Sequence, residues 1–315
     1  MAEKYNLIQS IKTAVSRVVV GRERTIDLMT AAFLCGGHVL LEDVPGTGKT
    51  LLAKTMAKAL DLDFQRIQFT PDLMPSDVTG LNYYNQKAGE FIFKAGPVFT
   101  NILLADEINR ATPRTQSALL ECMEEHQVTT DGETRKLEEP FFVIATQNPI
   151  ETGGTYPLPE AQMDRFVMQL SMGLPNLEEE LAILERFEKD NPLDSISPVC
   201  GKKEILELRE KLTEIYIHPV LMKYIVSIVE GTREQSSILH GASPRGTLAL
   251  MRVSKAYAMG KGRDYVVPED IKETAVPVLA HRLVLSQRRG GSQAARKAVQ
   301  DILGSVPVPT EEWKR

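Results

Sequence analysis

The sequence predicts an α/β domain built on a parallel sheet, followed by an all-helical domain. Three observations support this prediction. Short apolar runs alternate with helical patterns, a glycine-rich turn joins the first run to a helix, and strand patterns stop after 172–177 while amphipathic helices continue. Alternation of strand and helix is typical of parallel sheets. We therefore expect an α/β domain at 1–173 and a helical domain at 174–315.

Five apolar runs are the candidate strands of the sheet. They are His38–Leu41, Phe64–Phe69, Ile102–Ala105, Phe141–Ala145 and Phe166–Leu170. The first, third and fourth are almost continuously apolar, as expected for strands that helices cover on both faces.

Helices are predicted between these strands and throughout the second domain. The first is Lys49–Leu60. A second runs to about Glu125, with Thr112 as its N-cap and Pro113 as its first residue. Six further helices are predicted in the second domain, at 177–188, 203–215, 219–232, 244–259, 268–284 and 291–303.

Two insertions interrupt the strand and helix pattern of the first domain. Residues 70–100 contain two β-like stretches around a polar turn that includes glycine. Residues 126–138 place Asp131-Gly132 between β-like flanks, which is a hairpin signal.

Composition excludes several classes of protein. The chain has 315 residues, a formal net charge of −5 and a pI near 5.7, so bulk charge does not favour non-specific nucleic-acid binding. Cys35, Cys122 and Cys200 lack zinc-site spacing and fit reduced thiols. No signal sequence and no run of ~18 apolar residues is present, so we expect a soluble cytoplasmic protein without a membrane span.

The turn after the first strand, "DVPGTGKT" at 43–50, nearly matches the phosphate-binding pattern G-x-x-x-x-G-K-[ST]. Lys49 is expected to reach the β- and γ-phosphates of ATP, and the Thr50 hydroxyl to bind Mg²⁺. Asp43 replaces the first glycine, and we expect it to adopt a positive φ with its carboxylate turned away. The candidate nucleotide-binding segment is Asp43, Val44, Pro45, Gly46, Thr47, Gly48, Lys49, Thr50 and Leu51.

Polar residues at the ends of two later strands are candidate catalytic groups. Asp106 follows a buried strand and can hold Mg²⁺, and Glu107 beside it can polarise the attacking water. Asn148 ends the next strand, where a contact to the γ-phosphate and a role as a turn former before Pro149 are both open.

Two arginines stand in contexts that call for an anion. Arg245 lies near a predicted helix N-terminus, which repels cations, so either a phosphate or an acidic neighbour should compensate. Arg165 follows Asp164, and this pair on its own is equally consistent with a surface salt bridge.

Taken together, these motifs resemble the AAA+ ATPases, most closely the MoxR branch that carries a helix-2 insert. The resemblance rests on "VVVGRERTID", "LLEDVPGTGKT", "QFTPDLMPSDVTG", "LLADEINRATPRTQSALLECMEE", "FFVIATQNPIETGGTYPLPEAQMDRF" and "GASPRGTLAL", and spans nearly the whole chain. It implies a five-stranded parallel sheet in order 5-1-4-3-2, a helical lid and a homo-hexamer. It also identifies 70–100 as the helix-2 insert and 126–138 as the hairpin before sensor 1.

The resemblance also implies residue roles. Lys49 and Thr50 belong to Walker A, and Asp106 and Glu107 to Walker B. The remaining assignments are Asn148 as sensor 1, Arg245 as sensor 2 on its own phosphates, Arg165 as the arginine finger offered to the neighbouring subunit, and Val20 and Gly21 as part of the adenine pocket. Members of the branch commonly carry Asp at the position of Asp43.

The function that this resemblance implies is ATP hydrolysis used for chaperone-like remodelling, assembly or metal-cofactor insertion, with ATP and Mg²⁺ as cofactors. The partner is expected to be a protein, such as one with a von Willebrand A domain. A DNA-translocating motor is the main alternative, but the hairpin turn Thr130-Asp131-Gly132-Glu133 is acidic. A small-molecule kinase does not explain the insertions, and a scaffold without turnover does not explain Glu107.

Overall fold

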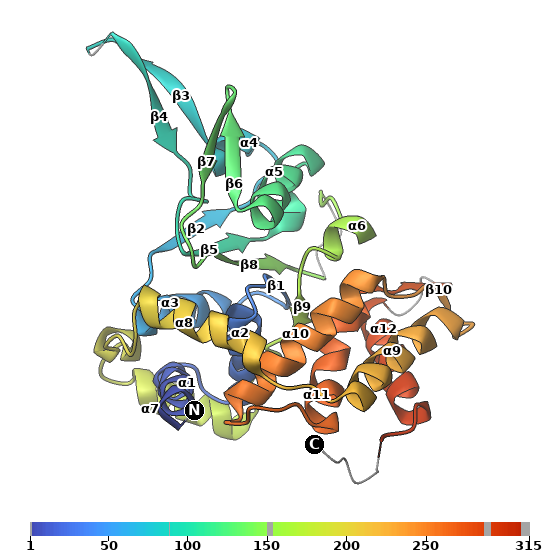
Figure 1. Cartoon of the computed structure of the whole chain (residues 1–315). Helices are drawn as coiled ribbons and strands as arrows, with labels where there is room; N and C mark the ends of the chain where they lie inside the picture. The colour runs from blue at the N-terminus through green and yellow to red at the C-terminus, as the bar shows by residue number, and fades with distance from the viewer. Residues whose placement is uncertain (1, 88, 150–153, 287–290, 310–315) are drawn as a thin grey trace.

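The computed structural model describes residues 2–87, 89–149, 154–286 and 291–309. Its centre is a five-stranded parallel sheet in the order β2-β5-β8-β1-β9 (Figure 1). This is the predicted order 5-1-4-3-2 read from the other edge, so the expectation is confirmed. The strands are β1 (Val39–Glu42), β2 (Phe64–Gln68), β5 (Ile102–Asp106), β8 (Phe142–Gln147) and β9 (Met168–Leu170).

The sheet separates two apolar cores because alternate residues of each strand point to opposite faces. Val39 and Leu41 of β1 contribute to one core, and Leu40 contributes to the other. The first core also contains α1 (Ala2–Ser16), α2 (Glu23–Leu34) and α3 (Lys49–Ala59), and the second contains α5 (Pro113–Glu125). Helices thus cover both faces of the sheet, which explains the continuously apolar strands.

Two helix details differ from the sequence prediction. The helices α1 and α2 precede the sheet, where no element is predicted from the sequence. Thr112 occupies the N-cap position of α5, but its hydroxyl pairs with Thr115 Oγ1 at 3.3 Å and makes no capping bond. The helix is started by Pro113 at its first position, where the missing N–H costs nothing.

Both insertions form hairpins that project from the same side of the α/β domain (Figure 1). The longer one follows α4 (Pro75–Thr79) and consists of β3 (Gly80–Asn85) and β4 (Glu90–Ala95). The shorter one consists of β6 (Gln127–Thr130) and β7 (Glu133–Lys136). In its turn, Asp131 and Gly132 have φ of 53° and 82°, as a tight hairpin turn requires. Both predicted hairpins are therefore confirmed.

The part of the chain after the sheet is mainly helical and packs against the α/β domain, since α10 (Pro244–Gly260) lies beside α2 and one apolar core runs through both. The predicted end of the 268–284 helix is wrong. The helix stops at Leu279, a short 3-10 turn follows, and β11 pairs with β10. Leu283 and Leu285 pack on the same core as the helix, so the apolar pattern did not mark its end.

The helices and strands that follow the sheet are α7 (Leu177–Phe187), α8 (Lys202–Lys211), α9 (Pro219–Glu234), β10 (Ile238–His240), α10 (Pro244–Gly260), α11 (Pro268–Leu279), β11 (Val284–Leu285) and α12 (Gly291–Ser305). Across the described residues, none of the helices has the length and apolar character needed to cross a membrane.

Candidate nucleotide-binding site

The glycine-rich turn connects the carboxyl end of β1 to the N-terminus of α3. Gly46 and Gly48 have φ of 86° and 89°, a region that L side chains rarely adopt, and Gly48 is the N-cap of α3. The backbone N–H groups at the start of α3 have no partners within the helix, so this terminus suits an anion. Lys49 begins the helix, and its Nζ donates to the carbonyl oxygens of Asp43 at 2.9 Å and Val44 at 3.3 Å.

Asp43 does not have the positive φ that we expected, so that explanation of the missing glycine is wrong. The strand pairing continues through this residue, because its N–H donates to the carbonyl oxygen of Gln147 at 3.3 Å. The carboxylate does point away from the loop. It accepts hydrogen bonds from Ser171 Oγ at 2.7 Å and from the N–H groups of Met172 at 2.6 Å and Gly173 at 3.1 Å.

Asp106 ends β5 and Glu107 follows it, and a shared threonine sets the positions of both. Thr146 Oγ1 donates to Asp106 Oδ1 at 2.6 Å and accepts from the Glu107 N–H at 2.8 Å. Glu107 has φ of 56°, so the chain turns sharply after the strand. Its carboxylate accepts from Gln68 Nε2 at 2.7 Å and pairs with Arg110 Nε at 3.0 Å.

These groups meet at the carboxyl ends of three neighbouring strands, because β8 lies between β1 and β5. Asn148 follows β8 and is buried, so it stands between the turn after β1 and the acids after β5. The carboxyl ends of parallel strands are the usual place for ligands in open α/β sheets. The structure thus brings Lys49, Asp106, Glu107 and Asn148 to one side of the molecule.

The residues present fit ATP with Mg²⁺. Within the described ranges, no group of three or more His, Cys, Asp or Glu side chains is placed to hold a metal. Mg²⁺ commonly binds through one or two protein oxygens, phosphate oxygens and water. Thr50 at the start of α3 and Asp106 supply such oxygens, although Asp106 Oδ2 is paired with Arg66 Nη2 at 2.6 Å in this structure.

The candidate adenine side is closed by the start of the helical domain. Gly21 has φ of 66°, and a Cβ there would lie 2.2 Å from Glu179 Oε1. Arg22 pairs with Glu179 Oε2 at 3.0 Å and donates to the Gly173 carbonyl oxygen at 3.2 Å. Gly21 and Arg22 therefore lie against the chain segment that leaves the sheet, part of which Asp43 holds.

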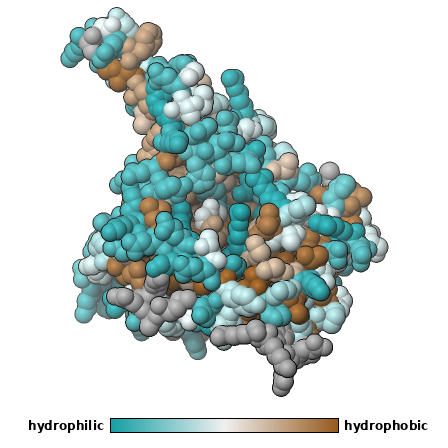
Figure 2. All heavy atoms as spheres, viewed as in Figure 1, coloured by the Kyte–Doolittle hydropathy of each residue, from teal (hydrophilic) through white to brown (hydrophobic). Residues whose placement is uncertain are grey.

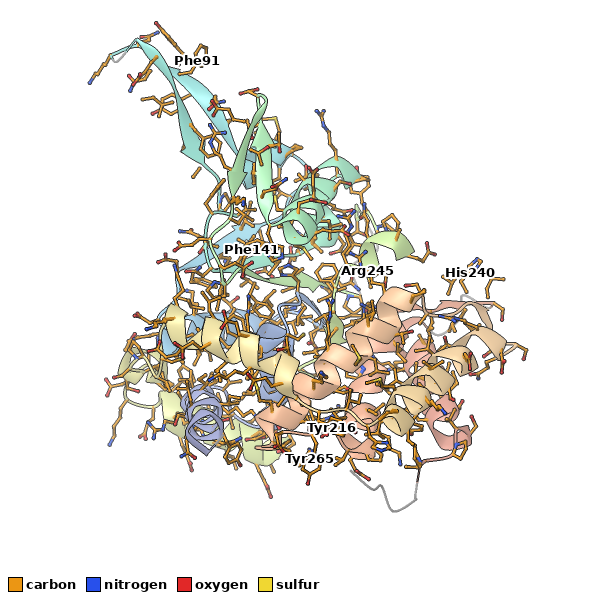
Figure 3. All side chains as sticks on the ribbon, in the orientation of Figure 1. Phe91, Phe141, Tyr216, His240, Arg245 and Tyr265 are labelled. Carbon is orange, nitrogen blue, oxygen red and sulfur yellow. The ribbon has the colours of Figure 1, made fainter. Side chains whose placement is uncertain are left out.

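Arg165 and Arg245 lie on the opposite side of the sheet, at the amino ends of its strands. Both pair with Glu124, at 2.9 Å and 2.5 Å, and both line a pocket of about 370 Å³ that includes His38. His38 directly precedes β1, and the phosphate loop directly follows β1. The pocket and the loop are therefore separated by the length of this four-residue strand, about 13 Å. Figure 3 shows Arg245 at the upper side of α10, facing the α/β domain.

In this structure Arg245 therefore lies away from the phosphate loop of its own chain. On sequence grounds either a phosphate or an acidic neighbour could compensate Arg245, and within the chain that neighbour is Glu124. Arg165 also forms a salt bridge, but its partner is Glu124 and not the adjacent Asp164.

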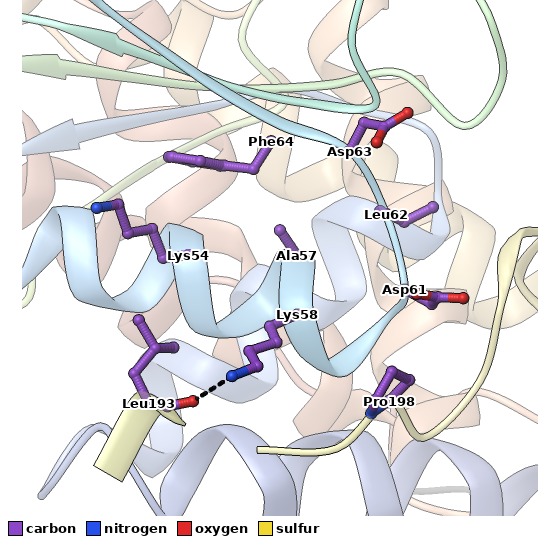
Figure 4. Close-up of a pocket in the computed structure, with 9 residues that line it drawn as sticks. All are labelled: Lys54, Ala57, Lys58, Asp61, Leu62, Asp63, Phe64, Leu193 and Pro198. Atoms are coloured by element: carbon purple, nitrogen blue, oxygen red, sulfur yellow. Dashed lines mark hydrogen bonds between the residues drawn. The ribbon is translucent and has the colours of Figure 1, made fainter. Parts of the chain in front are cut away.

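Sequence reasoning missed Arg66, Gln68, Thr146 and Glu124. Only Thr146 carried a local signal, as a polar residue inside an apolar strand. The others depend on contacts between distant segments. The pocket drawn in Figure 4, about 510 Å³, is not part of this site, because it lies at the carboxyl end of α3, lined by Lys58 and Leu193 among others, and contains none of the predicted residues.

Comparison with known proteins identifies the family. Residues 38–168 match the family described as "ATPase family associated with various cellular activities (AAA)", and residues 230–302 match the AAA lid domain. The chain is 43% identical to Chaperone MoxR1 of Mycobacterium tuberculosis over 318 residues, covering 98% of this chain and 84% of that one. It is 33% identical to Protein MoxR of Paracoccus denitrificans, covering 95% of each.

Two further relatives match over nearly full length. Uncharacterized protein YeaC of Bacillus subtilis is 49% identical over 298 residues, covering 94% of this chain and 93% of that one. A crystal structure from Cytophaga hutchinsonii, described as a candidate ATPase, has a TM-score of 0.90 and 44% identity, covering 98% and 97%. The P-loop domain with its helical lid and these relatives show that the chain belongs to the AAA ATPases, in the MoxR family.

Proposed function

We propose that this protein hydrolyses ATP to ADP and phosphate and uses the reaction to remodel or assemble partner proteins, in the manner of a chaperone. The observation that carries the proposal is that Asp106 and Glu107, both held by Thr146, lie at the same carboxyl end of the sheet as the phosphate loop. The chaperone named among the relatives supports the second half of the proposal.

Each group at the loop edge has a chemical task in this proposal. Lys49 turns from the carbonyl oxygens of Asp43 and Val44 to the β- and γ-phosphates. Thr50 and Asp106 would hold Mg²⁺, which would neutralise phosphate charge when bound. Glu107 polarises the attacking water, and Asn148 orients that water or the γ-phosphate. In this structure Gln68 and Arg110 hold the Glu107 carboxylate, so it must leave them to act.

The test of hydrolysis is phosphate release by the purified chain with ATP and Mg²⁺. Glu107→Gln keeps the side-chain shape but removes the charge that polarises water, so turnover should fall about 10²-fold or more while ATP still binds. Glu121→Gln, on the exposed side of α5, is the matched control and should keep full activity. Unchanged turnover in Glu107→Gln would show that another group activates the water.

The proposal places Arg165 and Arg245 in the ATP site of a neighbouring subunit. The two arginines lie on the side of the sheet opposite the phosphate loop. A head-to-tail contact between subunits therefore brings the arginines of one subunit to the phosphate loop of the next. A head-to-tail contact that closes forms a ring, and we propose a homo-hexamer. An arginine supplied in this way is worth about 10³–10⁵-fold in rate.

A mixture of two inactive variants tests this arrangement. Arg165→Ala keeps its own ATP pocket but has no arginine to offer, and Lys49→Ala has the reverse defect. By random assortment about one interface in four combines the intact pocket with the intact arginine, so the mixture should regain activity. With subunit exchange verified, a mixture that stays inactive contradicts a role for Arg165 across the interface.

A protein partner fits the projecting hairpins better than DNA does. Tyr84 and Phe91 are exposed near the tip of the longer hairpin, with their rings 5.3 Å apart, and Phe91 lies near the far end of the arm (Figure 3). Figure 2 shows hydrophobic atoms at this end of the arm. In the shorter hairpin Arg135 pairs with Glu133 and lies 4.0 Å over the Phe93 ring, so its charge is already engaged. DNA motors hold phosphates with cations at such hairpins, and the exposed Lys87 and Lys136 are candidates for that role, so stimulation of the ATPase by DNA would contradict a protein partner.

The identity of the partner is part of the proposal. A protein with a von Willebrand A domain is the candidate, and metal-cofactor insertion is one form the remodelling can take. Trapping partners with the ATP-bound Glu107→Gln variant, with the hairpin variant Phe91→Ala as the comparison, tests both the partner class and the contact surface.

A further inference from the structure

Arg282 is a buried cation whose guanidinium surrounds the chain segment that carries Arg165. Its side chain is only 3% exposed. Nε donates to Asp164 Oδ1 at 2.7 Å, and Nη2 donates to the carbonyl oxygens of Phe166 at 2.8 Å and Asp164 at 3.3 Å. Nη1 donates to the Val167 carbonyl oxygen at 3.3 Å. The acceptors therefore lie on both sides of Arg165 in the sequence.

Other residues of the lid hold the same segment. His281 Nε2 lies 3.0 Å from the Phe166 carbonyl oxygen. The second oxygen of Asp164 accepts from Ser243 Oγ at 3.3 Å, and Ser243 is the N-cap of α10. Asp164 thus connects the 3-10 turn of Arg282 to the start of the helix that carries Arg245. The two candidate arginines are held in one framework.

The geometry of Arg282 matters more than its charge. A buried charge is costly unless it is paired and fully hydrogen-bonded, and an apolar residue of similar size is often no less stable. Arginine differs from lysine in presenting several N–H groups in a rigid planar fork. Here that fork engages one carboxylate and three backbone carbonyl groups of a four-residue segment, which fixes the path of the backbone.

We propose that Arg282 is a positioning residue for Arg165. It holds the backbone of 164–167 to the lid, so that Arg165 is presented to the nucleotide of the neighbouring subunit and moves together with the lid of its own chain. The inference rests on the proposed role of Arg165 across the interface. Among the described residues, the contacts of Arg282 do not include the phosphate loop, so its loss should spare the ATP pocket of its own chain.

The test begins with Arg282→Lys, which keeps the charge and loses the fork. A misplacement of about 1 Å can cost about 10²-fold in rate, so kcat should fall by about that factor while KM for ATP is unchanged. Arg263→Lys is the matched control. Arg263 makes a two-point ion pair with Asp270 inside the lid, at 2.7 Å and 2.6 Å, and touches nothing near Arg165 in the described structure. It should lose stability but keep kcat.

Mixed oligomers separate a positioning role from general damage. Arg282→Lys mixed with Lys49→Ala should regain activity, because the first supplies a complete pocket and the second a well-placed Arg165. Arg282→Lys mixed with Arg165→Ala should stay inactive, because both lack a working arginine. If Arg282→Lys folds poorly, Asp164→Asn weakens the same ion pair from the other side and should give the same pattern.

The outcomes distinguish this inference from the function on which it rests. One outcome overturns the positioning role and leaves the trans role of Arg165 intact. It is that the mixture of Arg165→Ala and Lys49→Ala regains activity, while mixtures of Lys49→Ala with Arg282→Lys or with Asp164→Asn do not. Full kcat in Arg282→Lys alone also overturns it. If the Arg165→Ala mixture stays inactive, the trans role of Arg165 and this inference both fail.

Discussion

The carboxylate of Asp43 accepts a hydrogen bond from the backbone N–H of Met172 at 2.6 Å, which ties the first residue of the phosphate loop to the chain that leaves the sheet. Ser171 and Gly173 donate to the same carboxylate, and Arg22 donates to the Gly173 carbonyl oxygen. The loop, the candidate adenine side and the linker to the lid therefore share one set of contacts. This relation gives Asp43 a purpose that its position in the loop did not suggest.

The first prediction follows from that carboxylate. Asp43→Asn keeps the shape but presents an amide N–H₂ where N–H groups now donate, and Asp43→Gly removes the acceptor altogether. Hydrogen bonds to a charged group are worth about 1.5–3 kcal/mol each, so either change should lower the free energy of unfolding by about 2–4 kcal/mol. Denaturant titration measures this.

Both Asp43 variants should also weaken ATP binding, because the loop loses its attachment to the linker. From the sequence alone, Asp43→Gly would restore the usual loop pattern and keep full activity. An Asp43→Gly protein as stable and active as the original chain would therefore show that the three hydrogen bonds contribute little.

The second prediction concerns Lys49. Its Nζ donates to two loop carbonyl oxygens in this structure and is free to exchange them for phosphate oxygens. Lys49→Ala should weaken ATP binding about 10–100-fold, the equivalent of one strong charge-assisted hydrogen bond or more. Lys54→Ala, further along α3 and exposed, is the control. Titration with a fluorescent ATP analogue would contradict the site if Lys49→Ala bound as tightly as the control.

The third prediction concerns stability at low pH. His126 beside Glu139, and then the Arg209 guanidinium at 2.8 Å, lower the pKa of Glu139 from 4.5 to about 2. A carboxyl whose pKa is depressed by folding adds stability above its unfolded pKa, and that stability is lost as the pH falls through the folded pKa. Glu139 should therefore make unfolding more pH-dependent between pH 4.5 and 2.

Glu139→Gln removes this contribution, so the difference in unfolding free energy between the two proteins should shrink as the pH is lowered through that window. Because the Glu139 side chain is 42% exposed, the effect is screened and modest. The check is a series of denaturant titrations from pH 7 downward. A difference that stays constant with pH would mean that the ion pairs do not hold Glu139 ionised.

How far the sequence predicts this molecule depends on the range of the contacts involved. Apolar runs predicted the strands, and Asp131-Gly132 predicted the short hairpin, because both signals are local. The sheet order came from the resemblance. The partners of Asp43 are 128–130 residues away, and Glu124 lies far from Arg245 in the chain, so only the fold brings them together. The positive φ expected at Asp43 was wrong because it was inferred from local context alone.

The last prediction is that Arg245 works on the ATP of a neighbouring subunit. Arg245 shares Glu124 with Arg165 at the edge of the sheet opposite the phosphate loop. Arg245→Ala should therefore bind ATP with near-normal affinity and hydrolyse it slowly, while Lys255→Ala, further along α10, should behave like the original chain. Mixtures decide between the two sides of the interface.

If Arg245 acts in trans, Arg245→Ala mixed with Lys49→Ala should regain activity, because the first brings a complete pocket and the second an intact arginine. The mixture with Arg165→Ala should stay inactive, because both partners lack an arginine to offer. If Arg245 acts on its own phosphates, the two results are exchanged. Phosphate release from the two mixtures, with subunit exchange verified, thus gives opposite patterns for the two arrangements. The structure favours action in trans. To reach the phosphate loop of its own chain, Arg245 would have to leave Glu124 and move along the full length of β1, about 13 Å.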